Sequence, residues 1–478
     1  MSPVRIPATG DLPESILASL AAMRGEDARY REGRTWSMIY YAGDGHHQLV
    51  QAAHDLYLAE NALNPMAFKS LRRMEVEVVQ MASGLLNGPP STVGCMTSGG
   101  TESLILAMKT WRDAGLSRRP WLRSPEVVLP RTAHPAFDKA AHMLGMRLRK
   151  AEIGADGRVD LHHVGRLIGR RTVLLVGSAP QYPHGTVDPI PQLGELAARH
   201  GIPLHVDACF GGFILPWLER LGVVMPAWDL RVPQVRSISA DLHKYGYAAK
   251  GAAVLLYRRI EDMKHQFFVT TDWPGGIYAS PGLAGTRPGG PIAAAWAALH
   301  AMGEQGYLER AGEAWQVAER LRAGVRAIPG LHLLGRPESP IVTWAADPGG
   351  PDVYAIADLL QAAGWSVDRQ QAPASVHCST NAVNLQAVDR YLADLAEAAD
   401  RVRSNPSLSG EGQAAMYGMM AKVPVNGLVQ REVRKVMEKM YGPDGAPPEL
   451  GGEALPPWAG KALDLFDRAR RRVRGGRG

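Results

Sequence analysis

Short apolar runs alternate with helix-like segments through the middle of the chain, and this alternation constrains the fold more than any other feature. The runs are EVVLP at 126–130, TVLLVGSAP at 172–180, PLHVDA at 203–208 and AAVLLYR at 252–258. Strands that alternate with helices are typical of β–α–β units, in which successive strands pair in parallel. The pattern therefore predicts an α/β fold with a mostly parallel central sheet.

The remaining segments indicate how the chain of 478 residues is divided. We interpret residues 1–60 as an N-terminal arm with little core of its own and residues 61–310 as a large sheet domain. Strand-like and helix-like segments in residues 311–467 predict a smaller α+β domain. A long helix, broken near Gly303 and Gly306, is expected to link the two domains because glycine weakens a helix.

Charge and cysteine content limit the classes of protein to which the chain can belong. Residues 468–478 hold six arginines and no acid, which equals the whole net charge of +6. Such a tail can bind nucleic acid or an anionic membrane, but a disordered terminus is the commoner outcome, so we expect no nucleic-acid partner. No apolar run approaches the roughly 20 residues of a membrane-spanning helix. The three cysteines lack metal-ligand spacing, so we expect a soluble cytoplasmic protein without a metal site.

A cluster of hydroxyl residues and glycines, TSGGTES at 97–103, leads into an amphipathic helix. Free backbone N–H groups at the start of a helix attract an anion, and glycine lets the anion approach closely. Gly99, Gly100 and Thr101 are therefore candidates to hold a phosphate. Ordinary N-cap and turn chemistry would explain the same residues.

Asp207 ends the short apolar run PLHVDA. The carboxyl ends of parallel strands face the ligand crevice, and a carboxylate buried there needs a positively charged partner. A protonated ring nitrogen of a cofactor would serve. A helix N-cap or an ion pair with a nearby arginine would also explain the residue.

Lys244 lies in SISADLHKYGYAAKG, 37 residues after Asp207, which is about the length of one crossover. The small and apolar residues around it favour burial, and desolvation can make a lysine nucleophilic. A phosphate cradle, an acid for a ring nitrogen and a lysine for a Schiff base are what pyridoxal phosphate (PLP) requires of a protein. Together the three features predict a PLP site.

The sequence also resembles the sphingosine-1-phosphate lyases, a family of fold-type I PLP enzymes in the group II decarboxylase superfamily. The similar stretches are TSGGTES, AHPAFDKA, HVDACFGGF, SISADLHKYGYAAKG, GGIYASPGLAGTRPGG and AAMYGMM, which fall between about residue 36 and residue 420. HKYGYAAKG and GGIYASPGLAGTRPG are the most specific of them. The resemblance implies a seven-stranded type of central sheet, an N-terminal arm, a small C-terminal α+β domain and a homodimer.

The resemblance further implies roles for individual residues. Lys244 would carry the Schiff base, Asp207 would pair with the pyridine nitrogen, and His134 would stack on the cofactor ring. Tyr182 would lie near the reacting carbons. The cofactor phosphate would be bound by Gly100, Thr101 and His243, with Gly285 and Thr286 contributed by the second subunit.

A separate group of residues would bind the phosphate of the substrate. The resemblance assigns this role to Lys250, to Asn64 and to a tyrosine of the arm, either Tyr40 or Tyr41. The sequence departs from the family at one position, because the expected Asn-Pro-x-His element has Ala67 in place of histidine. One phosphate ligand is therefore missing.

Either of two neighbouring arm histidines, His46 or His47, could compensate for the missing ligand.

The resemblance implies retro-aldol cleavage of a phosphorylated long-chain base to a long-chain aldehyde and phosphoethanolamine. An amino-acid decarboxylase of the same superfamily is the alternative, and the missing histidine keeps it open. A non-catalytic scaffold is disfavoured because the lysine, the acid and the cradle are all intact. The eukaryotic members carry a membrane anchor that this sequence lacks, so we expect a soluble, bacterial type of lyase.

Overall fold

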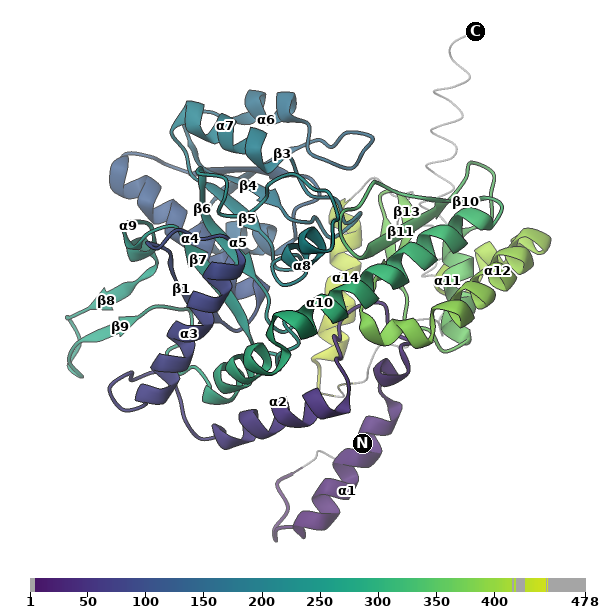
Figure 1. Ribbon diagram of the computed structural model, residues 1–478, viewed down its shortest axis with the longest axis horizontal. Coiled ribbons are helices and arrows are strands. Elements are labelled where there is room, and N and C mark those ends of the chain that lie inside the picture. Colours follow the sequence, from purple (N-terminus) through teal and green to yellow (C-terminus); the bar gives the residue numbers. More distant parts are fainter. Residues whose placement is uncertain (1–4, 415–416, 418–425, 444, 446–478) are drawn as a thin grey trace.

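The computed structural model describes residues 5–414, 417, 426–443 and 445. They form a large sheet surrounded by helices and a second, smaller sheet, and a long helix runs between the two (Figure 1). The arginine-rich tail at 468–478 and most of the AAMYGMM stretch lie outside the described residues.

The large sheet has seven strands in the order β1-β7-β6-β5-β4-β2-β3. They are β1 (Val93–Thr97), β2 (Glu126–Pro130), β3 (Arg147–Ala151), β4 (Thr172–Ser178), β5 (Leu204–Asp207), β6 (Val235–Ala240) and β7 (Ala253–Tyr257). The strands from β6 to β3 pair in parallel, whereas β7 is antiparallel to its neighbours β1 and β6. The predicted α/β fold with a mostly parallel sheet is confirmed.

Helices cover both faces of this sheet because its central strands, such as β4 and β5, are buried and largely apolar on both sides. In β4, Leu174 and Val176 belong to the core beneath α4 and α5, whereas Leu175 belongs to the core beneath α7 on the opposite face. The helices of this unit are α3 (Lys69–Leu85), α4 (Gly100–Arg118), α5 (Ala136–Leu144), α6 (Leu161–Leu167), α7 (Ile190–His200), α8 (Leu215–Arg220) and α9 (Ile260–Met263).

The smaller sheet has four antiparallel strands in the order β10-β11-β13-β12. Its strands are β10 (Leu331–Leu333), β11 (Ile341–Ala346), β12 (Asp368–Gln371) and β13 (Ala374–Ser379), and its helices are α11 (Val353–Ala362) and α12 (Val388–Ser404). We call this unit the small domain. Trp36 of the arm is fully buried in its core, with ring centroids 5.9 Å from Trp365 and 4.6 Å from Tyr391. The arm is therefore anchored in the small domain.

The long helix α10 (Gly289–Ala327) contributes its first part to the large-sheet core and its last part to the small-domain core. It is interrupted at Gly303, where φ is 55°, as predicted, whereas Gly306 is helical. The expected domain boundary at residue 310 falls within this helix.

The arm contains α1 (Pro13–Met23) and α2 (Asp44–Leu56), and the strands β8 (Phe268–Thr270) and β9 (Tyr278–Ser280) form a hairpin that projects from the body (Figure 1). The other elements are α14 (Asn426–Met440) and the 3₁₀ helices η1 (Arg24–Glu26), η2 (Tyr30–Glu32), η3 (Lys264–Gln266), η4 (Ala382–Gln386) and η5 (Pro406–Gly410). None of the described helices combines the length and apolarity needed to cross a lipid bilayer. Within the same part of the chain, no group of three or more His, Cys, Asp and Glu side chains could hold a metal ion.

Candidate active site

The candidate residues gather where strands of the large sheet end. β5 ends at Asp207, the loop after β6 carries Lys244, and the loops after β2 and β4 carry His134 and Tyr182. Gly100 opens α4 shortly after β1. Because the carboxyl ends of parallel strands lie along one sheet edge, these elements bring their side chains to the same region.

The turn between β1 and α4 is packed so closely that it accepts only glycine. Gly99 has a φ of 151°, and a Cβ built on it would lie 3.1 Å from Cε1 of His243. A Cβ on Gly100 would lie 2.8 Å from Sγ of Cys209 and 3.1 Å from both carboxylate oxygens of Asp241. The backbone N–H groups at the start of α4 therefore line a space that an anion can approach closely.

The first turn of α4 is fixed by its own side chains. Thr101 is exposed there, and the Glu102 carboxylate accepts hydrogen bonds from N and Oγ of Ser98 at 2.8 and 2.6 Å. Its other oxygen accepts from the backbone N–H of Leu283 at 3.2 Å. Glu102 thus links the glycine turn at the start of α4 to the segment that carries Gly285.

Lys244 is paired with a carboxylate, that of Asp241. The distance from Nζ to Oδ2 of Asp241 is 3.1 Å, and the lysine side chain is 26% exposed. Burial alone would lower the pKa of Lys244, but Asp241, together with Cys209 and Tyr40, outweighs burial and raises the pKa. The amine therefore carries a proton at neutral pH, which it must lose before it can act as a nucleophile.

Asp207 is buried without a cation. Its Oδ1 accepts a hydrogen bond from the backbone N–H of Cys209 at 3.0 Å, and no lysine or arginine in the described part of the chain forms an ion pair with it. Among these residues, an ion pair with a nearby arginine therefore does not explain the position of Asp207. A buried carboxylate in this position requires a positive charge from a ligand.

These observations fit PLP. The glycine turn suits its phosphate, Asp207 suits a protonated pyridine nitrogen, and Lys244 can form a Schiff base with its aldehyde. His243 adds a further group, because its Nδ1 is buried beside Gly99 without a hydrogen-bond partner among the described residues. Burial lowers the pKa of His243 to about 4, so the neutral ring can direct one N–H group into the cradle.

His134 lies in the loop between β2 and α5, where its side chain is exposed. Its Nδ1 accepts a hydrogen bond from the backbone N–H of Ala136 at 3.1 Å, which fixes the orientation of the ring at the start of the helix. A ring held at this edge of the sheet is available to stack on a planar ligand.

Tyr182 bridges the large-sheet unit and the small domain. Its Oη donates a hydrogen bond to Oδ2 of Asp368 at 3.1 Å, and its ring stacks on His377 with centroids 4.1 Å apart. Burial and the Asp368 carboxylate raise the pKa of Tyr182, so its hydroxyl stays protonated. Burial lowers the pKa of His377 to about 4, and His377 therefore stacks as a neutral ring.

The arm places one of its two neighbouring tyrosines towards the lysines. Tyr40 packs edge-on against Tyr245, with centroids 4.7 Å apart, and its ring lies 5.7 Å from Nζ of Lys250. Tyr41 instead donates its hydroxyl hydrogen to Asp44, within the arm. The geometry therefore favours Tyr40 over Tyr41 as the arm residue at this site.

Lys250 lies beneath the arm. Its Nζ donates to the backbone carbonyl of Met38 at 2.5 Å, and no carboxylate of the described residues is within ion-pair distance of it. Burial and the nearby charge of Lys244 lower the pKa of Lys250. The arm histidines contact other residues. His46 Nε2 lies 2.9 Å from the carbonyl oxygen of Tyr247, and the His47 ring centroid lies 6.0 Å from that of Tyr41.

Three predicted residues make no direct contact with Lys244 among the hydrogen bonds and ion pairs of the described residues. Asn64 is exposed and its Oδ1 accepts from the backbone N–H of Met66 at 2.9 Å, in the turn that also carries exposed Ala67. Thr286 lines a cavity of about 240 Å³, and Gly285 packs near Tyr278. In the described part of the chain, no hydrogen bond joins Asn64, Gly285 or Thr286 to Lys244.

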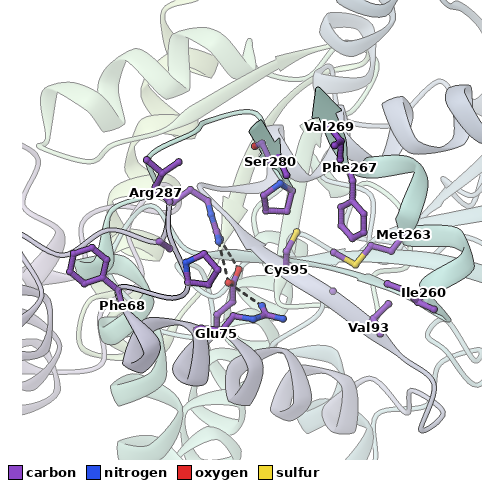
Figure 2. A pocket seen from close by; sticks show the side chains of 17 residues that line it. Phe68, Glu75, Val93, Cys95, Ile260, Met263, Phe267, Val269, Ser280 and Arg287 are labelled. Carbon is purple, nitrogen blue, oxygen red and sulfur yellow. Dashed lines mark hydrogen bonds and ion pairs between the residues drawn. The ribbon is translucent and has the colours of Figure 1, made fainter. Parts of the chain in front are cut away.

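An ion pair fixes the segment that carries Gly285 and Thr286. Arg287 Nη1 lies 2.6 Å from Oε1 of Glu75 (Figure 2). The same oxygen accepts a hydrogen bond from the backbone N–H of Met96 at 3.0 Å. The pair borders a mainly apolar cavity of about 520 Å³ between α3 and the β8–β9 hairpin, which Lys244 does not line. Glu75 therefore holds the segment against the strand that precedes the glycine turn.

Comparison with known proteins agrees with this site. Residues 58–346 match the family model described as "Pyridoxal-dependent decarboxylase conserved domain". The sphingosine-1-phosphate lyase of Oryza sativa is 37% identical over 441 residues, which cover 91% of this chain and 81% of that protein. Sphingosine-1-phosphate lyase 1 of Rattus norvegicus is 38% identical over 92% of this chain and 77% of that protein. The chain belongs to the sphingosine-1-phosphate lyase family.

Solved structures give the same result. A sphingosine-1-phosphate lyase from Burkholderia pseudomallei superposes with a TM-score of 0.81 at 38% identity, covering 84% of this chain and 94% of that chain. A Lactobacillus brevis glutamate decarboxylase, with a TM-score of 0.74 at 19% identity, covers 84% of this chain and 95% of that chain and shares the fold. As a member of the lyase family, the protein is a PLP-dependent enzyme.

Sequence reasoning missed several groups of the lyase site. Asp241 was visible three residues before Lys244, but nothing in that spacing revealed that the two side chains meet. Asp368 and His377 belong to the small domain, which had no predicted part in the site. No local signal could have found them, because each meets Tyr182 only in the folded chain.

Proposed function

We propose that this lyase cleaves phosphorylated long-chain bases of the sphingosine 1-phosphate type to a long-chain aldehyde and phosphoethanolamine. The relatives named above support the proposal. The observation that carries it is Lys250, an exposed lysine near Lys244 whose ammonium group has a carbonyl and no carboxylate as its partner among the described residues. Such a cation attracts a ligand with a second anionic group, which a substrate phosphate supplies.

In this proposal each side chain has a definite task. PLP supplies an electron sink for the bond that breaks between the amine-bearing and the hydroxyl-bearing carbon. Asp207 would hold the ring nitrogen in its protonated form, and His134 would stack on the ring. Tyr182 would accept a hydrogen bond from the substrate hydroxyl at Oη, while its own hydroxyl hydrogen stays directed at Asp368.

Binding of the substrate phosphate, at a distance from the reacting carbons, then selects the bond that breaks. Lys250 and Tyr40 hold the substrate phosphate, and this anchor orients the scissile bond relative to the ring. Lys244 would hold PLP as a Schiff base before the substrate binds and would give up this place to the substrate amine.

We further propose a homodimer whose subunits complete one another's sites. Asn64, Gly285 and Thr286 would reach the partner's cradle and substrate phosphate. In support, their segments adjoin: the backbone N–H of Ala62 donates to the carbonyl of Arg287 at 2.8 Å. Exposed apolar side chains gather on the same segments and on the neighbouring hairpin, namely Leu63, Met66, Ile277 and Leu283.

A reducing compartment, the cytoplasm, is proposed as the location of the enzyme. In support, Cys95, Cys209 and Cys378 are all free and buried.

One assay tests the reaction. Purified protein loaded with PLP is incubated with sphingosine 1-phosphate, and we expect equal amounts of long-chain aldehyde and phosphoethanolamine. Carbon dioxide from amino acids, with no aldehyde from the phosphorylated base, would instead support the decarboxylase alternative.

Lys250→Met tests the phosphate anchor. Loss of one charge-assisted contact should raise KM for the phosphorylated base about tenfold to a hundredfold. Lys139→Met, which removes an exposed lysine of α5, is the matched control. An unchanged KM in the Lys250 variant would exclude this residue as the anchor.

A further inference from the structure

Asp241 is a second buried carboxylate of the cofactor site. Its side chain is 3% exposed, and Oδ2 lies 3.1 Å from Nζ of Lys244 and 3.5 Å from Nε2 of His243. Its Oδ1 is buried without a hydrogen-bond partner among the described residues. Neither the PLP requirements nor the resemblance gives this residue a task.

Asp241 and Asp207 lie in different segments of the large-sheet unit. Asp207 ends β5 and pairs in register with Ser239 of β6, whereas Asp241 lies two residues beyond Ser239, at the start of the loop that carries Lys244. Asp207 is hydrogen-bonded to a backbone N–H and has no ion pair in the described residues, whereas Asp241 is in ion-pair contact with the lysine nitrogen. The two carboxylates therefore act on different atoms.

Among the described residues, the packing around Asp241 places no cation other than Lys244 and the His243 ring close to its carboxylate. A Cβ on Gly100 would lie 3.1 Å from both of its oxygens, so the glycine turn closes one side of the carboxylate. Lys244 and His243 are the cationic or potentially cationic groups within ion-pair distance in the described part of the chain. His243 is mostly neutral, because burial lowers its pKa to about 4. The negative charge is thus directed at the Lys244 nitrogen.

We propose that Asp241 is a positioning residue that serves as the counter-ion of the Lys244 nitrogen and retains a proton on it when that nitrogen is joined to PLP. Condensation of the neutral amine with the aldehyde expels water and leaves an imine, whose nitrogen can bind a proton. A carboxylate beside that nitrogen stabilises the protonated, cationic form. The protonated imine is the better electrophile for an incoming amine, so Asp241 would prepare the site for substrate.

Several other titratable groups face this nitrogen, and they determine how large the effect can be. Cys209 comes from the loop after β5, Tyr40 from the arm, and His243 and Lys250 from the loop of Lys244 itself. Lys250 is a like charge and opposes the effect of Asp241. We therefore expect removal of the Asp241 charge to lower the pKa of the imine by about one to two units, less than an unopposed contact pair would give.

The test uses the absorbance of bound PLP, which changes when the imine loses its proton. Asp241→Asn, loaded with PLP, is titrated from acid to alkaline pH beside the wild-type protein. We expect the midpoint of Asp241→Asn to fall by about one to two pH units, and Asp241→Glu, which restores the charge, to recover at least half of that shift. Because no substrate is present, the result is independent of the proposed reaction.

Controls separate this role from a structural one. Asp188→Asn neutralises another fully buried aspartate, whose carboxylate accepts from the backbone N–H groups of Val159 and Ser178, and should leave the midpoint unchanged. Asp241→Ser provides a second neutral variant should the asparagine disturb folding. Equal midpoints for the wild-type protein and a folded, PLP-loaded neutral variant would overturn the proposal, as would equal midpoints for Asp241→Glu and Asp241→Asn.

Discussion

Replacement of Gly100 by alanine tests how closely the glycine turn is packed. The new Cβ would lie 2.8 Å from Sγ of Cys209 and 3.1 Å from both oxygens of Asp241, and the buried sulfur and carboxylate have little room to move. Overpacking of this kind costs about 1–3 kcal/mol. If the strain displaces the start of α4, the same free energy is lost from phosphate binding, which corresponds to a rise of about 5-fold to 150-fold in the Kd for PLP.

The assay is titration of the PLP-free protein with PLP, followed by absorbance, together with thermal unfolding before PLP is added. Gly84→Ala is the matched control, because that glycine is exposed in α3 and a Cβ there meets nothing within 4 Å. It should leave the Kd unchanged and stabilise the helix by up to about 1 kcal/mol.

Cys209→Ala identifies the group responsible for the strain. Combined with Gly100→Ala, it removes the sulfur that the new Cβ would meet first, so we expect at least about 1 kcal/mol of favourable coupling in the double-mutant cycle. A Gly100→Ala protein that binds PLP as tightly as the wild-type protein, with unchanged thermal stability, would refute the argument from packing.

Two further variants test contacts that hold the site from outside. Asp368→Ala leaves Tyr182 Oη without its acceptor and should lower kcat about tenfold to a hundredfold while KM and the PLP absorbance stay constant, whereas a change in KM alone would contradict a role at the reacting carbons. Glu75→Gln leaves Arg287 without its buried partner and should destabilise the protein by about 3–5 kcal/mol at pH 7, measured by urea unfolding. Burial would raise the pKa of Glu75, but Arg287 outweighs it and the pKa is lowered. The part of the wild-type advantage that depends on the Glu75 charge is therefore complete above the ordinary pKa of 4.5 and is lost as the pH falls through the lowered pKa of the folded protein. A difference between the two proteins that is the same at pH 3 and pH 7 would contradict this assignment.

The part of the fold that can be predicted is the part that depends on local sequence patterns. Short apolar strands with helices between them bury both faces as a parallel sheet, which accounts for β2, β4 and β5. The fourth predicted run became β7, which is antiparallel to its neighbours, and β6 was not recognised as a strand from the sequence. The glycine turn was visible for the same reason, because a helix start after a strand end is a local arrangement. Gly306 shows the limit of such reasoning, because it is helical although glycine has a low helix propensity.

The unpredictable part consists of contacts between distant segments. Tyr40 and Tyr41 are adjacent in sequence, and only the fold shows that one faces Tyr245 while the other faces Asp44. Adjacent side chains of an extended segment point to opposite sides, so their order in the chain cannot decide which one is inside. The Asp368 partner of Tyr182 is hidden in the same way, because no local pattern relates β12 to the loop after β4.

The same contacts show why the loop of Lys244 depends on all parts of the molecule. On one side the arm reaches it, since the carbonyl of Met38 accepts from Lys250 at 2.5 Å. On the other side the small domain reaches it, since Tyr245 Oη donates to the carbonyl of Thr380 at 2.5 Å. Arm and small domain are also joined to each other, because Ser379 Oγ donates to the carbonyl of Trp36 at 2.7 Å. A change in any of these contacts therefore alters the position of a loop that holds both Lys244 and Asp241, and the pH titration of bound PLP would detect it without a substrate.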